Sequence, residues 1–506
     1  MEHLAHANAP ASDVHAERRA LVFIGFMGAG KSTAARLAGE ALGVQAIDSD
    51  QLLEERFGHS VAREFALHGE ASFRAAEEEV VCALLHRADA RSVIALGGGS
   101  ILSERVREAL EPHLTVLLDI DADRAWKRAT NKKDERELKR PLASDQDAFN
   151  ALHSERASLY VQLADAILPG TPRESLDDAI PALRQLAAAP AATKLLWASA
   201  ASGSYPVFLG AGLLESGFWP VQSDRRFALS DETVADLYLK DLGELSASFT
   251  ITPGEQHKTL ASAERIWGEL ARAGMTRADQ LVALGGGVVG DLAGFCAATY
   301  QRGVPVVHVP TTVVAQVDSA YGGKTGVDLP EAKNYVGAYH QPAGVLLDPD
   351  TLATLPPAEF AAGWVEALKT ALIAGGRLWE RLAQDEPVDQ EIILGCARTK
   401  LAIVAEDERD SGPRQVLNLG HTVGHAIEVV TGYQRLRHGE AVGLGLLAAL
   451  RLSGNAGLRD QVKELLSAHG LPVSIQGIDP QEVIAAIAFD KKRTGAHVPF
   501  VLVHSP

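Results

Sequence analysis

The stretch LVFIGFMGAGKSTAARLAGEALG, residues 21–43, places a glycine loop between two different periodicities. The apolar run before the loop predicts a buried strand, and the small and apolar residues after it recur at helical spacing. The pattern G-x-x-x-x-G-K-S is matched by Gly25, Gly30, Lys31 and Ser32. In such a loop the backbone amides and the lysine surround phosphate oxygens, and the serine hydroxyl reaches a magnesium ion. We therefore predict a nucleotide phosphate site in a parallel α/β domain.

The bulk composition limits the protein class. The chain has 506 residues and a net charge of -17, with 46% hydrophobic residues, which predicts two to four globular domains. The acidic balance argues against nucleic acid or an anionic membrane as a partner, because phosphate-rich surfaces attract cationic faces. No apolar run is long enough to span a bilayer. The cysteines are widely separated, and the polar N-terminus is unlike a signal peptide, so we expect a cytoplasmic protein.

Two blocks of strand–helix alternation indicate the domain organisation. The first fades near residue 168, and the second begins near residue 204 and gives way to helical patterns near residue 355. Between them lies an Ala/Pro/Ser-biased stretch in which Leu195, Leu196 and Trp197 indicate that the second half packs or pairs. We therefore predict a disordered tail at 1–19, a P-loop domain at 20–184, a linker at 185–203, an α/β domain at 204–354 and a helical domain at 355–506. The predicted fold class is α/β: a P-loop kinase-type parallel sheet, an α/β nucleotide-binding domain and a mostly helical metal-binding domain.

A group of histidines in the helical segment has metal-ligand spacing. His421 and His425 lie four residues apart, on one face of a predicted helix, while His438 opens another helix and Glu366 lies on an earlier one. Three nitrogen and oxygen ligands that leave open positions are typical of a catalytic zinc site. The spacing does not decide whether His421 or His425 is the ligand.

A second glycine loop lies in LVALGGGVVGDLAGF, residues 281–295, where Gly285, Gly287 and Gly290 follow a predicted strand. The G-x-G-x-x-G spacing is a weak signal for dinucleotide binding, because no acidic residue follows about twenty positions later. The alternative is a tight strand-to-helix turn.

The N-terminal domain resembles shikimate kinase across about residues 19–169. The shared segments, in order after the P-loop, are AIDSD at 46–50, GEASFRAAEEEVV at 69–81, ALGGGS at 95–100, a basic stretch at 124–142 and SERASLY at 154–160. This resemblance implies ATP- and Mg²⁺-dependent phosphorylation of shikimate. Gluconate and nucleoside monophosphate kinases are the alternatives for this half of the chain.

The resemblance also implies residue roles in the kinase domain. Asp50 would bind the shikimate hydroxyls and is a candidate base, while Gly98 would bring backbone close to the substrate. Arg74 and Arg156 would hold the carboxylate. Arg140, in the lid, would neutralise charge on the transferred phosphoryl group. ATP would be held by Gly28, Ala29, Gly30, Lys31, Ser32, Thr33 and Arg140, and magnesium by Ser32 and Asp48.

Residues 204–503 resemble 3-dehydroquinate synthase. The shared segments include PGEQHKT at 253–259, the glycine loop through QRG at 285–303, VPTTVVAQVDSAYGGKTGVD at 309–328, AKNYVGAYHQP at 332–342, WVEALK at 364–369, PRQVLNLGHTVGHAIE at 413–428, HGEAVGLG at 438–445 and DKK at 490–492. The resemblance implies a homodimer that uses NAD and Zn²⁺ or Co²⁺. It would convert 3-deoxy-arabino-heptulosonate 7-phosphate to 3-dehydroquinate and phosphate.

The family's functional positions map onto this portion of the chain. The metal ligands would be Glu366, His421 and His438. The NAD site would comprise Glu255, Lys258, Gly285, Gly286, Gly287, Asp291, Thr311, Thr312, Lys324, Lys333, Thr351 and Thr354. The substrate would contact Arg302, Asp318, Lys324, Asn334, Lys369, Lys400, Arg414, His425 and Lys491, of which Lys369, Arg414 and His425 would be catalytic. Asp328, Ala332 and Thr370 depart from the usual family text.

Two alternatives remain for the chain as a whole. The C-terminal half could be a metal- and NAD-dependent polyol dehydrogenase or another sugar-phosphate cyclase, or one half could be an inert scaffold. A dehydrogenase would accumulate NADH, whereas the synthase would release phosphate without net NADH. The intact Lys31 and metal-ligand set argue against an inert half.

Overall fold

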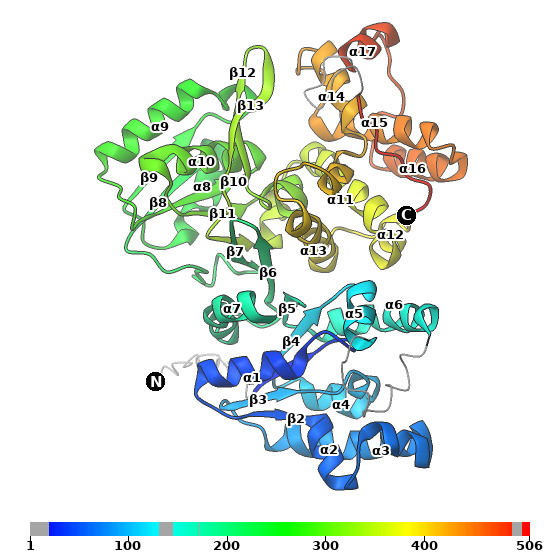
Figure 1. Ribbon diagram of the computed structural model, residues 1–506. Helices are drawn as coiled ribbons and strands as arrows, with labels where there is room; N and C mark the ends of the chain where they lie inside the picture. Colours follow the sequence, from blue (N-terminus) through cyan, green and yellow to red (C-terminus); the bar gives the residue numbers. More distant parts are fainter. Residues whose placement is uncertain (1–19, 131–144, 171, 488–497) are drawn as a thin grey trace, which may run out of the picture. The chain divides into compact units, whose positions relative to one another are not determined.

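The computed structural model describes residues 20–130, 145–170, 172–487 and 498–506. The chain divides into two compact units, residues 1–192 and 193–506 (Figure 1). The predicted tail at 1–19 lies outside the described residues. Within the described ranges, no helix has the length and apolar character needed to cross a membrane.

The first unit is built on a parallel sheet of strand order β2-β3-β1-β4-β5. The central strand β1 is apolar and almost wholly buried because it lies between β3 and β4. The strands are β1 (Ala20–Ile24), β2 (Ala46–Asp48), β3 (Ser92–Ala95), β4 (Leu114–Asp119) and β5 (Ala166–Pro169). The helices are α1 (Lys31–Leu42), α2 (Ser49–Phe57), α3 (Val61–Arg87), α4 (Glu104–Leu110), α5 (Ala122–Thr130), α6 (Gln146–Leu163) and α7 (Pro172–Ala187).

The second unit begins with a sheet of order β6-β7-β14-β11-β10-β8-β9, which is parallel except for the antiparallel pair β6–β7. Its strands are β6 (Lys194–Ala200), β7 (Gly203–Leu209), β8 (Arg226–Asp231), β9 (Ala247–Ile251), β10 (Gln280–Gly285), β11 (Val306–Pro310) and β14 (Gly344–Leu347). A separate antiparallel hairpin joins β12 (Lys324–Leu329) to β13 (Ala332–Tyr339). The stretch predicted as a linker therefore contains β6, and its apolar residues do pair, with β7.

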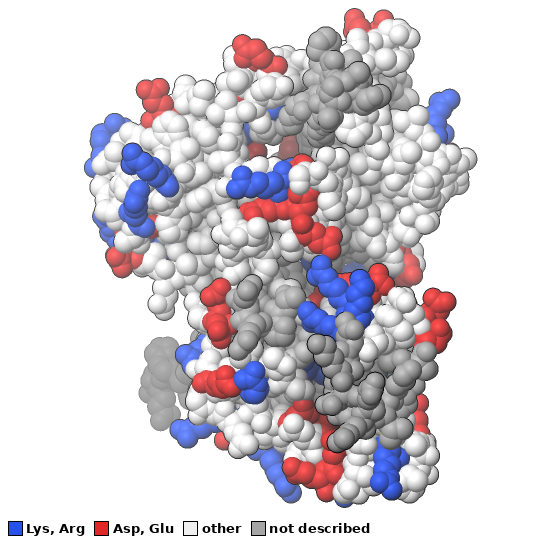
Figure 2. All heavy atoms as spheres, in the orientation of Figure 1, with Lys and Arg blue, Asp and Glu red and all other residues white. Residues whose placement is uncertain are grey.

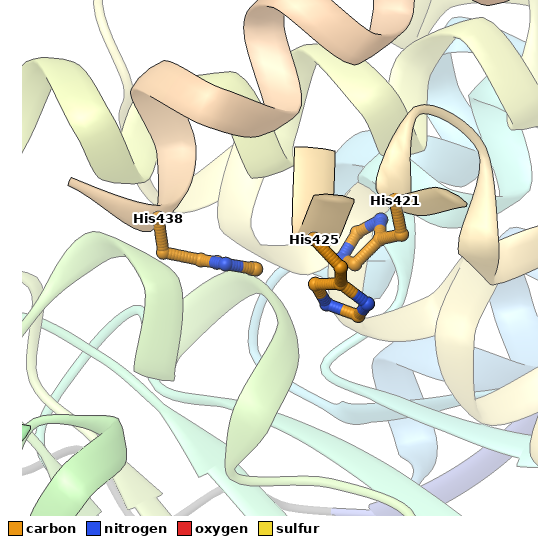
Figure 3. A group of neighbouring side chains, drawn as sticks. All are labelled: His421, His425 and His438. Carbon is orange, nitrogen blue, oxygen red and sulfur yellow. The ribbon is translucent and has the colours of Figure 1, made fainter. Parts of the chain in front are cut away.

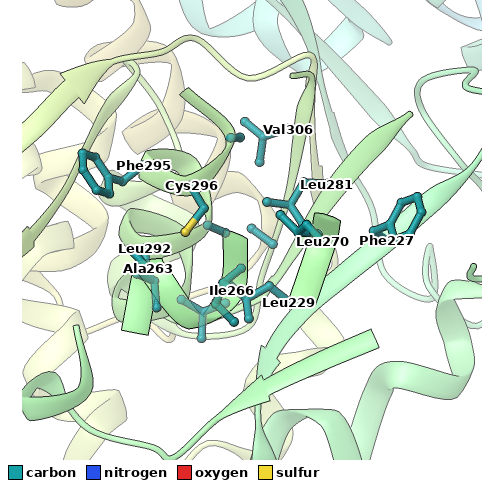
Figure 4. Close-up of a cluster of buried hydrophobic side chains, with 14 of the residues drawn as sticks. Phe227, Leu229, Ala263, Ile266, Leu270, Leu281, Leu292, Phe295, Cys296 and Val306 are labelled. Atoms are coloured by element: carbon teal, nitrogen blue, oxygen red, sulfur yellow. The ribbon is translucent and has the colours of Figure 1, made fainter. Parts of the chain in front are cut away.

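The core of this α/β half lies between the sheet and the helices α9 (Leu260–Arg272) and α10 (Gly287–Thr299). Figure 4 shows Ile266 and Leu270 of α9 facing side chains of the strands, among them Leu229 and Leu281. These side chains are fully buried. Burial of this apolar surface fixes α10 against the carboxyl end of β10, where the glycine loop lies.

The remaining chain is helical, as predicted. It comprises α11 (Pro357–Ala374), α12 (Gly376–Ala383), α13 (Gln390–Glu406), α14 (His421–Val430), α15 (His438–Leu452), α16 (Ala456–Ala468) and α17 (Pro480–Ile487), and α8 (Glu232–Tyr238) belongs to the α/β half. Glycines let three of these helices approach closely. A Cβ on Gly439 would lie 1.8 Å from the carbonyl oxygen of Ala362, and one on Gly445 would lie 1.9 Å from that of Gly420. The close packing brings the histidine-bearing ends of α14 and α15 to α11.

The predicted α/β fold class is confirmed, including the change to helices after residue 355. On the face shown in Figure 2, Lys and Arg side chains lie in short groups among Asp and Glu.

Candidate active sites

The P-loop joins β1 to α1 and is folded for close contact with an anion. Gly28 and Gly30 have φ values of 84° and 95°, which L side chains rarely adopt. The ammonium of Lys31 donates to the carbonyl oxygens of Gly25 at 2.8 Å and Phe26 at 3.3 Å. The amides at the start of α1 have no side-chain cap among the described residues. The loop is therefore suited to the phosphates of a nucleotide.

A second glycine run, residues 97–99 after β3, brings the other predicted kinase residues to the P-loop. A Cβ on Gly97 would lie 2.6 Å from Oδ1 of Asp50, and one on Gly99 would lie 2.0 Å from Nη1 of Arg74. A Cβ on Gly98 would lie 3.7 Å from Nζ of Lys31. A side chain at Gly97 or Gly99 would therefore displace Asp50 or Arg74 from its place beside this run.

Arg156 lies on α6, where it is buried. One turn later on this helix, the Tyr160 hydroxyl donates to the carbonyl oxygen of Gly98. Burial raises the pKa of Tyr160 above its usual range, although Arg156 and Arg74 oppose the shift. Both arginines therefore lie close enough to Tyr160 to act on it electrostatically. Arg140 lies outside the described residues.

Two carboxylates of this unit have structural contacts that the sequence did not show. Asp48 caps α2, because its Oδ1 accepts the amide of Asp50 at 2.9 Å. Glu77 holds the Arg74 guanidinium at 2.5 Å and also accepts the Ser100 hydroxyl at 2.8 Å. Arg74 is thereby oriented toward the glycine run.

In the second unit, a cavity of about 2020 Å³ is lined by both the α/β half and the helical half. The N-terminus of α10 opens into it, with Gly286 as the N-cap and no side-chain cap among the described residues. A Cβ on Gly286 would lie 2.9 Å from the Thr312 methyl group, so the backbone approach requires glycine. The buried Thr311 hydroxyl finds no hydrogen-bond partner in the described chain. A diphosphate at an uncapped helix N-terminus fits this cradle.

Lys258 lies beside the cradle in a buried cluster of charges. Its ammonium is 2.7 Å from Glu255, 3.3 Å from Asp291 and 3.7 Å from Asp328. Burial opposes the charged lysine, but the three carboxylates outweigh it and raise the pKa of Lys258. Burial likewise raises the pKa of Asp291 and of Asp328. A second ammonium, that of Lys333, lies 3.8 Å from Glu255, so two lysines and three carboxylates share this cluster.

Asp318 organises two buried lysines deeper in the cavity. Lys369 Nζ lies 3.0 Å from its carboxylate, and Lys400 Nζ donates to both its carboxylate and its carbonyl oxygen. Burial opposes ionisation of Asp318, but the two lysines outweigh it and lower the pKa to about 2. Burial lowers the pKa of Lys400, and Arg414 adds to that shift. These cations are placed to bind an anionic substrate.

Arg414 is buried at the start of the short helix Pro413–Asn418 and is oriented by backbone carbonyls. Its guanidinium donates to the carbonyl oxygens of Glu408 and of Gly322, the latter at 3.0 Å. The Nε atom has no hydrogen-bond partner in the described chain. The preceding loop is folded around Asp407, which accepts the amides of Ser411, Gly412 and Arg414.

The three predicted histidines meet at one end of the cavity. His421, His425 and His438 each offer a ring nitrogen, and these atoms lie within 4.8 Å of one another. Figure 3 shows His421 and His425 on one helix and His438 on another, with the rings directed into a shared space. Oε1 of the buried Glu366 lies 3.6 Å from Nε2 of His421 and 3.5 Å from Nε2 of His438.

The surroundings of this cluster fit a divalent cation. Both oxygens of Glu366 lack a hydrogen bond of normal geometry in the described chain, although Lys369 Nζ lies 2.6 Å from Oε2 as an ion pair. Burial disfavours a charged His438, but Glu366 and Glu428 outweigh it and raise its pKa to about 10. The cluster thus stabilises positive charge. Nδ1 of His421 contacts the Leu419 carbonyl oxygen at 3.1 Å, which leaves Nε2 to face Glu366.

Most of the predicted synthase residues line this one cavity. They are Glu255, Lys258, Gly286, Gly287, Asp291, Thr311, Thr312, Asp318, Lys324, Lys333, Asn334, Thr354, Glu366, Lys369, Lys400, Arg414, His421, His425 and His438. Gly285, Arg302 and Thr351 are not among the described residues that line it. Thr351 instead holds the buried Gln316 amide, and Arg302 lies on an exposed turn after α10. Lys491 lies outside the described residues.

Sequence reasoning did not assign roles to Glu428 and Asp328. Glu428 is buried, with Oε2 3.2 Å from Nδ1 of His438 and Oε1 3.1 Å from Nζ of Lys333. A signal was present, because His421, His425 and Glu428 follow an i, i+4, i+7 pattern on one helix face. Asp328, a departure from the usual family text, lies 3.7 Å from the ammonium of Lys258.

Comparisons with known proteins match the two parts of the chain to two enzyme families. The family model described as shikimate kinase matches residues 27–186. The models described as 3-dehydroquinate synthase N-terminal and C-terminal match residues 248–362 and 363–493. The chain is 42% identical to 3-dehydroquinate synthase of Halorhodospira halophila over 328 residues, which is 61% of this chain and 92% of that protein. It is 40% identical to the enzyme of Enterococcus faecalis over 322 residues, 59% of this chain and 90% of that protein.

The second unit is also similar to solved structures of two other synthases. A 2-deoxy-scyllo-inosose synthase complexed with carbaglucose-6-phosphate, NAD⁺ and Co²⁺ is 26% identical, with a TM-score of 0.55 over 62% of this chain and 94% of that one. The 2-epi-5-epi-valiolone synthase from Streptomyces hygroscopicus, with NAD⁺ and Zn²⁺ bound, is 27% identical, with a TM-score of 0.50 over 57% and 87%. The chain belongs to the 3-dehydroquinate synthase family and carries a shikimate kinase domain ahead of its synthase portion.

Proposed function

We propose that the residues gathered in the P-loop site and in the synthase cavity perform the two reactions of this bifunctional shikimate-pathway enzyme. The first is ATP-dependent phosphorylation of shikimate. The second is conversion of 3-deoxy-arabino-heptulosonate 7-phosphate to 3-dehydroquinate and phosphate. The observation that best supports the second role is the cavity itself, which combines an uncapped helix N-terminus, a cluster of cations and the Glu–His group.

In the kinase site, the P-loop amides and Lys31 hold the ATP phosphates, with Ser32 and Asp48 toward magnesium. Arg74 and Arg156 bind the shikimate carboxylate, and Asp50 accepts the proton of the attacking hydroxyl. Glu77 keeps the Arg74 guanidinium directed at the glycine run. We retain Arg140 as the residue that neutralises charge on the transferred group.

In the synthase cavity, Glu366, His421 and His438 would hold a divalent metal, and the α10 N-terminus with Lys258 and Thr311 would hold NAD. When bound, the metal polarises a ring hydroxyl and NAD provides a reversible hydride acceptor. Other NAD contacts are proposed for Glu255, Gly285, Gly286, Gly287, Asp291, Thr312, Lys324, Lys333, Thr351 and Thr354.

The protein side chains bind and orient the substrate. Lys369, Lys400 and Arg414 surround its anionic groups in a buried site, where such ion pairs are strong. Asp318 fixes the two lysines. His425 lies beside the metal ligands and shapes the pocket. In this pocket the substrate's own phosphate removes the C–H proton next to the oxidised ring carbon. Further contacts are proposed for Arg302, Lys324, Asn334 and Lys491.

We also propose that the protein is cytoplasmic and forms a homodimer through the synthase portion. The dimer follows from the resemblance to the synthase family, and the cytoplasm from the three unpaired, buried cysteines Cys82, Cys296 and Cys396. Sedimentation of the full chain and of a synthase fragment from residue 193 tests the dimer. Two monomeric species would contradict it.

A phosphate-release assay on the heptulosonate substrate tests the synthase assignment. We expect one phosphate per substrate with no net change in NADH absorbance, and loss of release after treatment with a chelator. Addition of Zn²⁺ or Co²⁺ should restore it. Accumulation of NADH would instead identify a polyol dehydrogenase, and turnover of a different sugar phosphate would identify another cyclase.

A further inference from the structure

Glu428 connects two parts of the synthase cavity that are far apart in sequence. It lies on α14, seven residues after His421, and its side chain is 2% exposed. One carboxylate oxygen faces Nδ1 of His438 at 3.2 Å, and the other faces the ammonium of Lys333 at 3.1 Å. Lys333 belongs to the β12–β13 hairpin of the α/β half. The carboxylate therefore contacts both halves of the cavity.

We infer that Glu428 is a positioning residue for the metal site, which orients the His438 ring through Nδ1. This inference rests on the proposed metal-dependent function. An imidazole can coordinate through either nitrogen, and a carboxylate hydrogen-bonded to Nδ1–H leaves Nε2 as the ligand atom. Nε2 of His438 is the atom that lies 3.5 Å from Oε1 of Glu366. The contact thus selects the nitrogen that faces the other ligands.

The need for such a partner follows from the position of His438. His438 is the first residue of α15, and no other residue of this helix belongs to the group formed by Glu366 and the three histidines. Of the two histidines near Glu366, His438 has the more exposed side chain. His421 has a backbone carbonyl in the corresponding place, at 3.1 Å from its Nδ1. The other carboxylate oxygen of Glu428 is held by the ammonium of Lys333, which limits rotation of the Glu428 side chain. The same ammonium lies 4.6 Å from the ring centroid of Tyr433.

The test measures metal binding in the full chain without substrate or NAD. Zn²⁺ affinity, by chelator competition, should weaken about 10–100-fold in Glu428→Ala and less in Glu428→Gln, because the amide oxygen can still accept from Nδ1. The visible absorption bands of bound Co²⁺ should shift in both variants. Glu359→Gln is the matched control, since it removes a carboxylate ion-paired with Arg437, next to His438, without touching the ring. It should retain wild-type affinity and spectrum.

The outcomes separate this inference from the proposed function. Wild-type affinity and an unchanged Co²⁺ spectrum in Glu428→Ala would overturn the positioning role alone. Failure of the wild type to bind metal, or binding that survives His421→Ala, would overturn the metal-dependent function and this inference with it. If the Glu428 variants do not fold, a crystal structure of the Zn²⁺-loaded wild type decides the matter. Coordination of the metal through Nε2 of His438, with Nδ1 hydrogen-bonded to Glu428, supports the inference. Coordination through Nδ1 of His438 contradicts it.

Discussion

The backbone amide of Ser202 donates to the carboxylate of Glu408 at 3.0 Å, across 206 positions of sequence. Glu408 also accepts the Gln341 amide at 2.8 Å, while its own backbone carbonyl accepts from the guanidinium of Arg414. The β6–β7 turn at the start of the synthase unit therefore helps to place an arginine of the substrate cavity. A similar contact exists at Tyr205, whose hydroxyl accepts the amide of Gly322, the second carbonyl partner of Arg414.

Replacement of Glu408 by Ala should weaken substrate binding by the synthase. Loss of the hydrogen bonds to the charged carboxylate frees the carbonyl that orients Arg414, at a cost of about 1–2 kcal/mol. We expect KM for the heptulosonate phosphate to rise about 5–30-fold, with a smaller change in kcat and unchanged shikimate phosphorylation. Steady-state kinetics of both reactions measures this. Glu391→Ala, at a surface ion pair with Arg377, is the control, and an equal KM in both variants would refute the coupling.

Substitution of Asp328 by Asn should alter the pH dependence of stability. Burial raises the pKa of Asp328 above its ordinary value of 3.8, so the folded protein binds its proton more tightly than the unfolded chain does. The stability that Asp328 contributes is present at low pH, where the side chain is protonated, and is lost as pH rises through the native pKa. The Asn variant does not undergo this loss. The free energy of unfolding of the variant minus that of wild type should therefore be more positive at pH 8 than at pH 4. Urea unfolding at both values measures the difference, and a pH-independent difference would contradict the assigned shift.

Truncation of Ile266 should destabilise the synthase unit without affecting the kinase. This side chain is fully buried between α9 and the sheet, so Ile266→Ala should cost about 2–5 kcal/mol. Calorimetry should show a lower Tm for the synthase transition, while shikimate phosphorylation survives to the same temperature as in wild type. A parallel loss of both activities on heating would mean that the two units unfold together.

Local patterns predicted the parts of the fold in which one segment determines its own structure. The P-loop, the strand before Gly285 and the helix that carries His421 and His425 are of this kind. The strand β6 was less visible, because its Ala/Ser-rich composition resembles a linker and only its partner β7 makes it a strand. The hairpin that carries Lys333 was also missed, since its pairing depends on glycines in mid-strand.

The candidate site showed the same division. Charged residues inside recognisable motifs could be assigned by resemblance, and most of them line the cavity. Glu428, Asp328 and Glu408 could not, because each has a partner far away in the sequence, namely Lys333, Lys258 and Ser202. The partners of Asp407 are nearby, but its role of gathering three backbone amides depends on the path of the loop rather than on a motif.

One measurement tests whether this chain carries two independent catalytic sites. Both reactions are measured in parallel on two variants of the full chain, Lys31→Ala and His421→Ala. Lys31→Ala should lose shikimate phosphorylation by at least about a hundredfold and keep phosphate release from the heptulosonate within about twofold of wild type. His421→Ala should show the reverse pattern, because it removes a metal ligand from the synthase cavity alone. Loss of both activities in either variant, with the fold intact by circular dichroism, would contradict the account.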